Sequence, residues 1–377
     1  MKIEYLDNAC CVYSANGFSL LADPWLTNGA FEGSWYHQVG ALNFDEKKIL
    51  SVDALYISHL HPDHFDPAFL KKFRKSIPVI VLDKKPNFLH RKLQELGFYN
   101  LVKVKDGETV TIGPFDLTMY APFTTHPFDE SVLGNFIDSA IVLEFGGKAY
   151  LNANDNTPTV ETAKRLKEKH DPFEIAQLKY ALAGPYPSCF LNLTDEEKLC
   201  EKERLLARQK TSMDAVVDAL GAKSVMSFAG SYCLAGSLTF KNKFLAVDGL
   251  DLNRIPEGAS YEYEKEDSVS IPELRELCIQ ARVNLWKRQE QFMFFPDYRF
   301  SIKLAEDTYI SFNFNSTFFD ERPAADLVCI MDPRLLRRIL KRESHWNNAE
   351  IGCHIDFIRE PNVYKPDIHT MFCFFHT

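Results

Sequence analysis

The chain has 377 residues, of which 46% are hydrophobic and 25% charged, and its formal net charge is −9. This composition is typical of a globular protein with room for two domains, or for one large domain with an appendage. The acidic balance argues against a general nucleic-acid binder, which needs a basic surface. It remains compatible with a small anionic substrate in a local pocket, so we expect a small-molecule partner.

No apolar stretch approaches the roughly 20 residues that a membrane-spanning helix needs. The segment Met1–Asp7 carries acidic side chains and no apolar core of signal-peptide length. The sequence has 9 cysteines, which is an odd number, and no Cys-x-x-Cys pair. This pattern is typical of reduced thiols. We therefore expect a cytoplasmic protein without a membrane span, and a homo-oligomer is compatible with the sequence.

Strands and helices are predicted to alternate along residues 1–250. Ala54–Ile57 reads as a buried strand because of its apolar and aromatic run, and Gly146-Gly147 marks a hairpin. A capping box at Thr194 and Glu197 marks the start of a helix. Further helices are expected over 66–75, 84–96 and 157–170, and further strands over 79–82, 101–104, 108–112, 116–120, 140–145 and 149–151. This order predicts an α/β layered domain over residues 1–250.

A second unit is predicted after the polar, acidic stretch 251–270, which is the best linker candidate because it contains Pro256 and Gly258. Ser270 and Glu273 are expected to cap a helix that runs to about residue 291. Strands over 300–304, 308–314, 327–331 and 354–358 follow, with a helix over 333–342. These elements predict a smaller α+β domain over residues 271–377.

Ser58–His64 (SHLHPDH) directly follows the buried strand and contains three of the 11 histidines. His59 and His61 are two residues apart, so the pleat of an extended chain points both rings the same way. Pro62 then turns the chain and leaves Asp63 and His64 facing the same hollow. Imidazoles and a carboxylate that converge in this way suit zinc, iron or manganese. The alternative is a polar loop that is merely rich in histidine.

Two further candidate ligands follow later strands. His126 comes after the strand expected to end at residue 120, and Asp155 after the strand expected to end at residue 151. Both stand where a strand leaves a sheet, which is where layered α/β folds collect functional groups. Taken alone, the histidine could be a surface residue and the aspartate a turn former or helix cap.

In this order, the His-x-His-x-Asp-His motif, the later histidine and the later aspartate resemble the metallo-β-lactamase superfamily over roughly residues 1–240. The resemblance implies an αββα sandwich, here followed by the smaller C-terminal α+β domain. It also implies one or two divalent ions per chain, with zinc as the first choice and iron or manganese as alternatives. Carried over residue by residue, the first metal would be held by His59, His61 and His126, the second by Asp63 and His64, and Asp155 would bridge the two.

One departure from the superfamily pattern concerns the second metal. The superfamily usually has a final histidine after a later strand, but the corresponding segment, 224–233, contains none. Cys233 could substitute, although a thiol in an apolar run is more often a core residue. The second ion is therefore expected to be weakly held or completed by substrate, and operation with a single ion stays open.

Shorter motifs resemble one branch of the superfamily. Asp23–Leu26, Gly184–Ser188 and Phe228–Gly230 are similar to proteins of cell-surface polysaccharide and nucleotide-sugar pathways. That branch includes the metallo-β-lactamase part of the CMP-N-acetylneuraminate hydroxylases and is related to ascorbate-phosphate lactonases. Those hydroxylases also carry a Rieske cluster, whose Cys-x-His and Cys-x-x-His pair does not occur in this sequence. The segment Ala325–Leu327 and its surroundings weakly resemble a sterol-carrier-like domain.

The leading functional hypothesis is a metal-dependent hydrolase of a phosphoester, lactone or amide in a small anionic or sugar-derived substrate. In this reading Asp63 orients or deprotonates the attacking water. Trp35 and His37 could wall the substrate pocket, with core packing as the alternative for Trp35. The competing hypotheses are a non-haem di-iron oxygenase that acts on a nucleotide sugar and a catalytically degenerate metal-binding protein.

Overall fold

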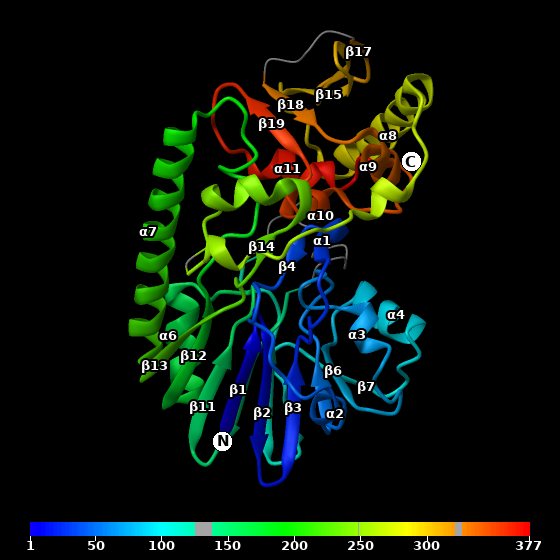
Figure 1. The fold of residues 1–377 in the computed structure, drawn as a ribbon. Coiled ribbons are helices and arrows are strands. Elements are labelled where there is room, and N and C mark those ends of the chain that lie inside the picture. The colour runs from blue at the N-terminus through cyan, green and yellow to red at the C-terminus, as the bar shows by residue number, and fades with distance from the viewer. Residues whose placement is uncertain (125–137, 248, 321–325) are drawn as a thin grey trace.

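The computed structural model describes residues 1–124, 138–247, 249–320 and 326–377. Its N-terminal part contains two six-stranded sheets (Figure 1). The first sheet consists, in spatial order, of β1 (Lys2–Asp7), β2 (Cys10–Ala15), β3 (Phe18–Ala22), β5 (Ala54–Tyr56), β6 (Val79–Leu82) and β7 (Leu101–Val104). The strands β1 to β3 pair antiparallel, and the pairing from β3 to β7 is parallel.

The second sheet runs, in spatial order, through β13 (Ser224–Phe228), β12 (Phe173–Lys179), β11 (Lys148–Asn152), β10 (Ala140–Phe145), β9 (Phe115–Tyr120) and β8 (Thr109–Ile112). The Gly146-Gly147 turn joins β10 and β11 as an antiparallel hairpin, which confirms the hairpin prediction. Both glycines have positive φ angles, of 60° and 69°, a region that other residues rarely adopt.

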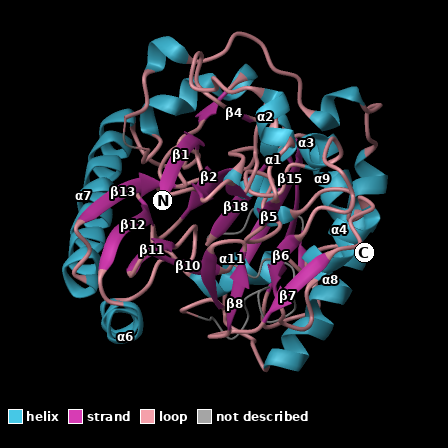
Figure 2. Ribbon diagram, turned by 90° about the horizontal axis from the view of Figure 1, so that it is seen from below, coloured by secondary structure: helices cyan, strands magenta, loops and turns pink. Residues whose placement is uncertain are grey.

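Helices cover the outer faces of both sheets (Figures 1 and 2). The first sheet is covered by α2 (Glu46–Leu50), α3 (Pro67–Leu70) and α4 (Phe88–Glu95), and the second by α6 (Val160–His170) and α7 (Asp195–Leu220). A further apolar cluster, with Tyr13, Tyr56 and Leu117 among its members, fills the space between the sheets. This layering confirms the predicted αββα sandwich.

Local capping signals place several helices where the sequence predicts them. Thr194 and Glu197 form the expected capping box at the start of α7. The helix predicted over 84–96 begins later, at Phe88, because the Asn87 side chain accepts a hydrogen bond from the backbone of Leu89 and caps it there.

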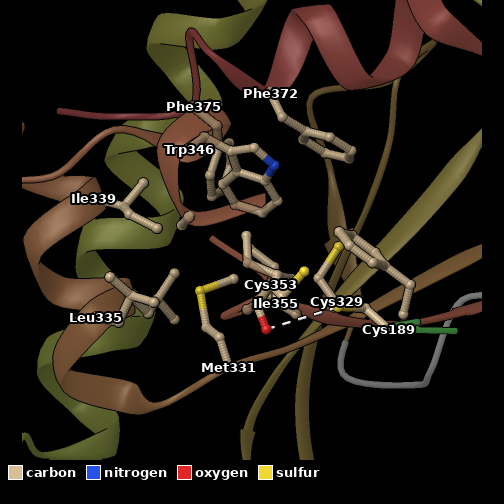
Figure 3. Packing of buried hydrophobic residues seen from close by; sticks show 14 of the residues in the cluster. Cys189, Cys329, Met331, Leu335, Ile339, Trp346, Cys353, Ile355, Phe372 and Phe375 are labelled. Carbon is tan, nitrogen blue, oxygen red and sulfur yellow. Dashed lines mark hydrogen bonds between the residues drawn. The ribbon is translucent and has the colours of Figure 1, made fainter. Parts of the chain in front are cut away.

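The C-terminal part is built around a five-stranded sheet. Its strands, in spatial order, are β17 (Phe319–Asp320), β16 (Thr308–Asn313), β15 (Arg299–Ala305), β18 (Leu327–Ile330) and β19 (Asp356–Arg359). The helices of this part are α8 (Ile271–Phe292), α9 (Pro333–Leu340), α10 (Trp346–Ile351) and α11 (Pro366–Phe372). Trp346 stacks on Phe372 with ring centroids 4.7 Å apart, inside a core that Figure 3 shows. These elements agree with the predicted α+β character.

The two parts of the chain share one hydrophobic core. A single cluster of buried residues contains Trp25, Phe31 and Trp35 from the N-terminal part together with residues of α8 to α11. Between the parts lie α1 (Ala30–Gly33) and the small sheet of β4 (Trp35–Tyr36) and β14 (Cys233–Leu234), with the 3-10 turns η1 (Gly236–Phe244), η2 (Leu252–Arg254) and η3 (Glu262–Lys265).

Two side chains anchor the stretch 251–270, the predicted linker, to the rest of the molecule. Tyr261 and Tyr263 in this stretch are only 2% and 7% exposed and belong to the shared core. The two tyrosine side chains, and not the acidic residues around them, decide the position of this stretch, because burial of large rings outweighs the cost of ordering a short segment. In the part of the chain that the structure describes, no helix is long and apolar enough to cross a membrane.

Candidate metal centre

The histidine motif and Asp155 meet at one end of the sandwich. The motif follows β5 of the first sheet, and Asp155 follows β11 of the second. One ligand atom each of His59, His64 and Asp155 lies within 4.8 Å of the others, a spacing that could hold a metal ion. The structure therefore brings together residues that the sequence places in two different segments.

A second group of possible ligands contains a residue that the sequence analysis missed. His59 and His61 lie with Asp138 at the same 4.8 Å spacing. Asp138 stands two residues before β10, and the separation of its carboxylate from His59 Nε2 is 3.7 Å. An acidic residue just before a predicted strand is the signal that could have identified it, but single acids at strand ends are common.

Hydrogen bonds from neighbouring side chains fix the orientation of two rings. Ser58 Oγ lies 2.9 Å from His59 Nδ1, and Asp23 Oδ2 lies 2.9 Å from His64 Nδ1. The Nε2 atoms of both rings consequently point to other candidate ligands, that of His59 to His61 Nδ1 at 2.8 Å and that of His64 to Asp155 Oδ1 at 3.8 Å. Such outer contacts select the tautomer of a metal-binding histidine and raise its basicity.

The donor atoms fit a divalent cation. His64 Nε2 is buried and makes no hydrogen bond among the described residues, although it lies 3.4 Å from Asp63 Oδ2 and 3.8 Å from Asp155 Oδ1. A buried nitrogen without a hydrogen bond is costly, and a cation bound among these three atoms removes that cost. Imidazole and carboxylate donors together suit zinc, iron and manganese.

Neighbouring charges shift the pKa values of the residues at the centre. Burial opposes ionisation of Asp63, but the neighbouring His64 and His61 and a hydrogen bond from Asn8 outweigh it and lower its pKa to about 2. Burial disfavours the charged form of His64, yet Asp63 and Asp23 raise its pKa well above the ordinary value. A metal ion at Nε2 would take the place of that proton. The pKa of His59 is lowered well below its ordinary value, chiefly by burial, which keeps the ring neutral and able to bind metal.

Lys179, which the sequence analysis also missed, brings a positive charge to the centre. It is the last residue of β12, and its Nζ lies 2.9 Å from Asp155 Oδ2. Burial disfavours its charge, but Asp155, Asp63 and Asp138 raise its pKa, so the ammonium stays protonated. Lysine is a common surface residue, and its position at a strand end could be used only once the neighbouring strand was known.

The structure does not place the other predicted site residues among the candidate metal ligands. His126 lies outside the described residues. Cys233 is buried in β14 with its thiol 3.4 Å from the Tyr36 carbonyl, which agrees with a core role and not with metal binding. Trp35 is 1% exposed and stacks on Tyr232 with ring centroids 3.4 Å apart. Its burial favours core packing over a pocket wall, so substrate contact there stays a prediction.

His37 is also buried, at 3% exposure. Its Nδ1 lies 2.7 Å from Asp7 Oδ2, and its ring packs on Trp25 with centroids 4.0 Å apart. Substrate binding by His37 likewise stays a prediction that its burial does not favour. The C-terminal part reaches the centre through Asn347 instead, whose Oδ1 lies 2.9 Å from His61 Nε2.

The chain is similar to several known proteins. Residues 2–137 match the family model described as a Beta-lactamase superfamily domain. Over 239 residues the chain is 29% identical to a Mycolicibacterium smegmatis protein named as a Rieske 2Fe-2S iron-sulfur protein, covering 62% of this chain and 44% of the relative. Over 173 residues it is 28% identical to the cytidine monophosphate-N-acetylneuraminic acid hydroxylase of Mus musculus, covering 45% of this chain and 28% of the hydroxylase.

Among solved structures, CmlA, a diiron beta-hydroxylase from Streptomyces venezuelae, aligns with a TM-score of 0.42 at 21% identity, covering 65% of this chain and 47% of that one. The chain spans less than half the length of the curated relatives described above. Together with the sandwich, the sequence matches confirm the resemblance to the metallo-β-lactamase superfamily, whose fold binds divalent metals. Within it, the resemblance to the branch of the CMP-N-acetylneuraminate hydroxylases is also confirmed. These findings support an enzyme without fixing its reaction.

Proposed function

We propose that the protein is a metal-dependent hydrolase that cleaves a phosphoester, lactone or amide in a small anionic or sugar-derived substrate. The supporting observation is that Asp63, Asp155 and Lys179 stand beside the histidines, so that a base and a fixed positive charge lie next to the candidate metal ligands. The motifs shared with nucleotide-sugar and polysaccharide proteins support a substrate from that chemistry.

A bound divalent ion would lower the pKa of a water molecule and polarise the bond under attack. The chain itself would contribute the proton acceptor and the oxyanion contact. Asp63 Oδ2, which accepts a hydrogen bond of 3.0 Å from Asn8 Nδ2, is held in place to orient the attacking water or to receive its proton. Lys179 Nζ would donate to the oxygen on which negative charge develops, in a site whose burial strengthens this interaction.

We predict that Asp63→Asn and Lys179→Met each lower kcat for a hydrolysed substrate by about 10²- to 10³-fold. The substrate would come from a panel of sugar phosphates, sugar lactones and N-acyl sugars assayed with the Zn²⁺-, Mn²⁺- and Fe²⁺-loaded enzyme. Lys179→Met is expected to keep its bound metal, because the lysine is not among the ligands. An Asp63→Asn enzyme that turns over at the wild-type rate would disprove the role of Asp63.

A second candidate is a non-haem di-iron oxygenase that acts on a nucleotide sugar, and the group of His59, His61 and Asp138 favours an iron site. Two histidines and one carboxylate around an open position are typical of iron oxygenases. The similarity to the Mus musculus hydroxylase supports this alternative. Iron in stoichiometric amount with oxygen uptake that depends on a nucleotide sugar would establish the oxygenase and exclude the hydrolase.

A third reading is a metal-binding protein without catalysis. It predicts tight metal binding with neither hydrolysis of the panel nor oxygen uptake. If the purified protein binds no divalent metal, and His59→Ala leaves its melting temperature unchanged, the site has lost its metal function altogether.

A further inference from the structure

A groove of about 690 Å³ lies outside the metal centre, between α7, the segment 183–186 and the C-terminal sheet. Its walls include Tyr186, from the Gly184–Ser188 motif, and Tyr364. Arg359, the last residue of β19, also lines this groove and is only 3% exposed. The groove therefore contains a guanidinium that is almost completely removed from bulk solvent.

The guanidinium of Arg359 has no negatively charged partner among the described residues. Its Nε and Nη2 both donate to the amide oxygen of Asn362, at 3.1 and 2.7 Å. Its Nη1 is buried and makes no hydrogen bond within the part of the chain that the structure describes. Because a buried charge is costly unless it is paired, the arrangement lacks an anion.

The carboxylates around the groove already have other partners. Glu201 accepts hydrogen bonds from the Tyr186 hydroxyl and the Arg204 guanidinium, at 2.8 and 2.7 Å. Glu350 Oε1 lies 2.9 Å from His369 Nδ1 and accepts a hydrogen bond from the Trp346 indole. Since these described carboxylates are engaged elsewhere, we expect a ligand to supply the anion.

Aromatic rings surround the guanidinium of Arg359 and indicate what kind of molecule could carry the anion. The centre of the Arg359 guanidinium lies 4.5 Å from the ring centroid of Phe190, 5.3 Å from that of Tyr186 and 5.9 Å from that of Tyr364. Tyr364 is 63% exposed, so its ring can cover a molecule that enters the groove. An apolar or ring-shaped body next to an oxyanion matches these surroundings.

We propose that this groove is a second ligand site, which binds a small molecule through a carboxylate or phosphate oxygen held by Arg359. Nε and Nη2 of Arg359 both donate to the neutral amide oxygen of Asn362. An oxyanion in the same position would accept charge-assisted hydrogen bonds, which are stronger than those to a neutral amide. Asn362 is exposed and can move aside without disturbing the core. The ligand oxygen replaces the Asn362 amide, and the body of the ligand packs on Tyr186 and Tyr364.

The test is calorimetric titration of the full chain with glucuronate, glucose 6-phosphate and inorganic phosphate, with glucose as the uncharged probe. The expected result is binding of at least one anion and none of glucose. Glucuronate and glucose 6-phosphate separate a carboxylate from a phosphate ligand. Asn362→Ala is expected to bind the anion about threefold or more tighter, because the competing amide is gone.

Asn362→Asp places a carboxylate of the chain next to Nε and Nη2 of Arg359. This variant is expected to melt at a higher temperature and to lose anion binding, and Arg359→Met is expected to lose binding as well. Lys202→Met, which removes one positive charge from α7 outside the groove, is the matched control and should bind like the wild type. Lys179→Met should also keep binding, which separates this site from the metal centre. Equal affinity in Asn362→Asp and wild type, or no anion binding by the wild type at about 10 mM, would overturn the proposal.

Discussion

Two side chains that are not themselves metal ligands decide which nitrogen the histidines offer at the centre. Ser58 occupies the Nδ1 side of His59, and Asp23 occupies the Nδ1 side of His64. Asp23 is completely buried, and it accepts further hydrogen bonds from the backbone and hydroxyl of Ser58. The charge of Asp23 therefore serves the orientation of the ring as well as the position of the motif.

We predict that Asp23→Asn weakens metal binding about 10- to 100-fold, since the amide cannot match the charge of the carboxylate on His64 Nδ1. Competition with a metal-binding dye gives the affinity directly. Asp53→Asn is the control, because the Asp53 carboxylate accepts hydrogen bonds from the Ser19 backbone and hydroxyl at the other end of β3 and β5. Equal affinities of the two variants would contradict the role of Asp23.

The sequence predicts the ligands that belong to a local pattern and misses those that depend on packing. His59, His61 and His64 stand out because they directly follow a recognisable strand. Asp138 and Lys179 are single polar residues at strand ends, and nothing local distinguishes them from turn or surface residues. Their positions follow from the pairing of β10, β11 and β12, which short-range periodicity does not determine.

At the scale of elements, α10 links the C-terminal part to the metal centre. Asn347 of this helix meets His61, which lies 286 residues earlier in the chain. Just beyond the helix, His354 Nε2 lies 2.9 Å from the Phe31 carbonyl, and its Nδ1 lies 3.1 Å from the Tyr263 hydroxyl. Contacts of such long sequence separation leave no signal in local composition, so the sequence could not place the C-terminal part over the site.

We predict that His354 makes the fold sensitive to mild acid. Burial lowers its pKa from 6.5 to about 4, so the unfolded chain binds more protons than the folded chain between these pH values. The stability due to neutral His354 is therefore complete above about pH 6.5 and is lost as the pH falls towards 4. Between pH 7 and 5 this residue should lower the free energy of unfolding by about 2 kcal/mol.

Urea denaturation of the wild type and of His354→Gln at both pH values measures this effect. Glutamine can keep hydrogen bonds to Phe31 and Tyr263 but does not titrate in this range. The variant should consequently lose about 2 kcal/mol less than the wild type on acidification. Identical pH dependence in both proteins would show that His354 is not buried in its neutral form.

At the scale of the whole molecule, one hydrophobic core joins the two predicted domains. The composition of the chain predicts units over 1–250 and 271–377, and this division remains our proposal for the arrangement of the sequence. The large side chains Trp25, Phe31 and Trp35, however, are buried together with residues of the C-terminal helices. The sequence shows how many apolar residues exist but not which of them pack together.

We predict that residues 1–250 expressed alone aggregate or unfold at a markedly lower temperature than the full chain. Removal of the C-terminal part exposes the apolar side chains that it covers, each of which contributes about 1.5 to 3 kcal/mol when buried. Melting curves of the fragment and of the full chain in the same buffer measure this difference in melting temperature. A fragment as stable as the full chain would show that the shared core is an interface between independently folding domains.

The measurement that tests the account most directly is the metal content of the purified full-length chain, determined by elemental analysis after removal of loosely bound ions. We predict at least one divalent ion per chain in the wild type and a loss of most of it in His59→Ala, because His59 belongs to both candidate ligand groups. His90→Ala, which removes a histidine whose ring nitrogen lies 3.0 Å from the Leu82 carbonyl and which belongs to neither candidate ligand group, should keep the wild-type content. Metal-free wild type, or equal metal content in His59→Ala and wild type, would contradict the metal centre.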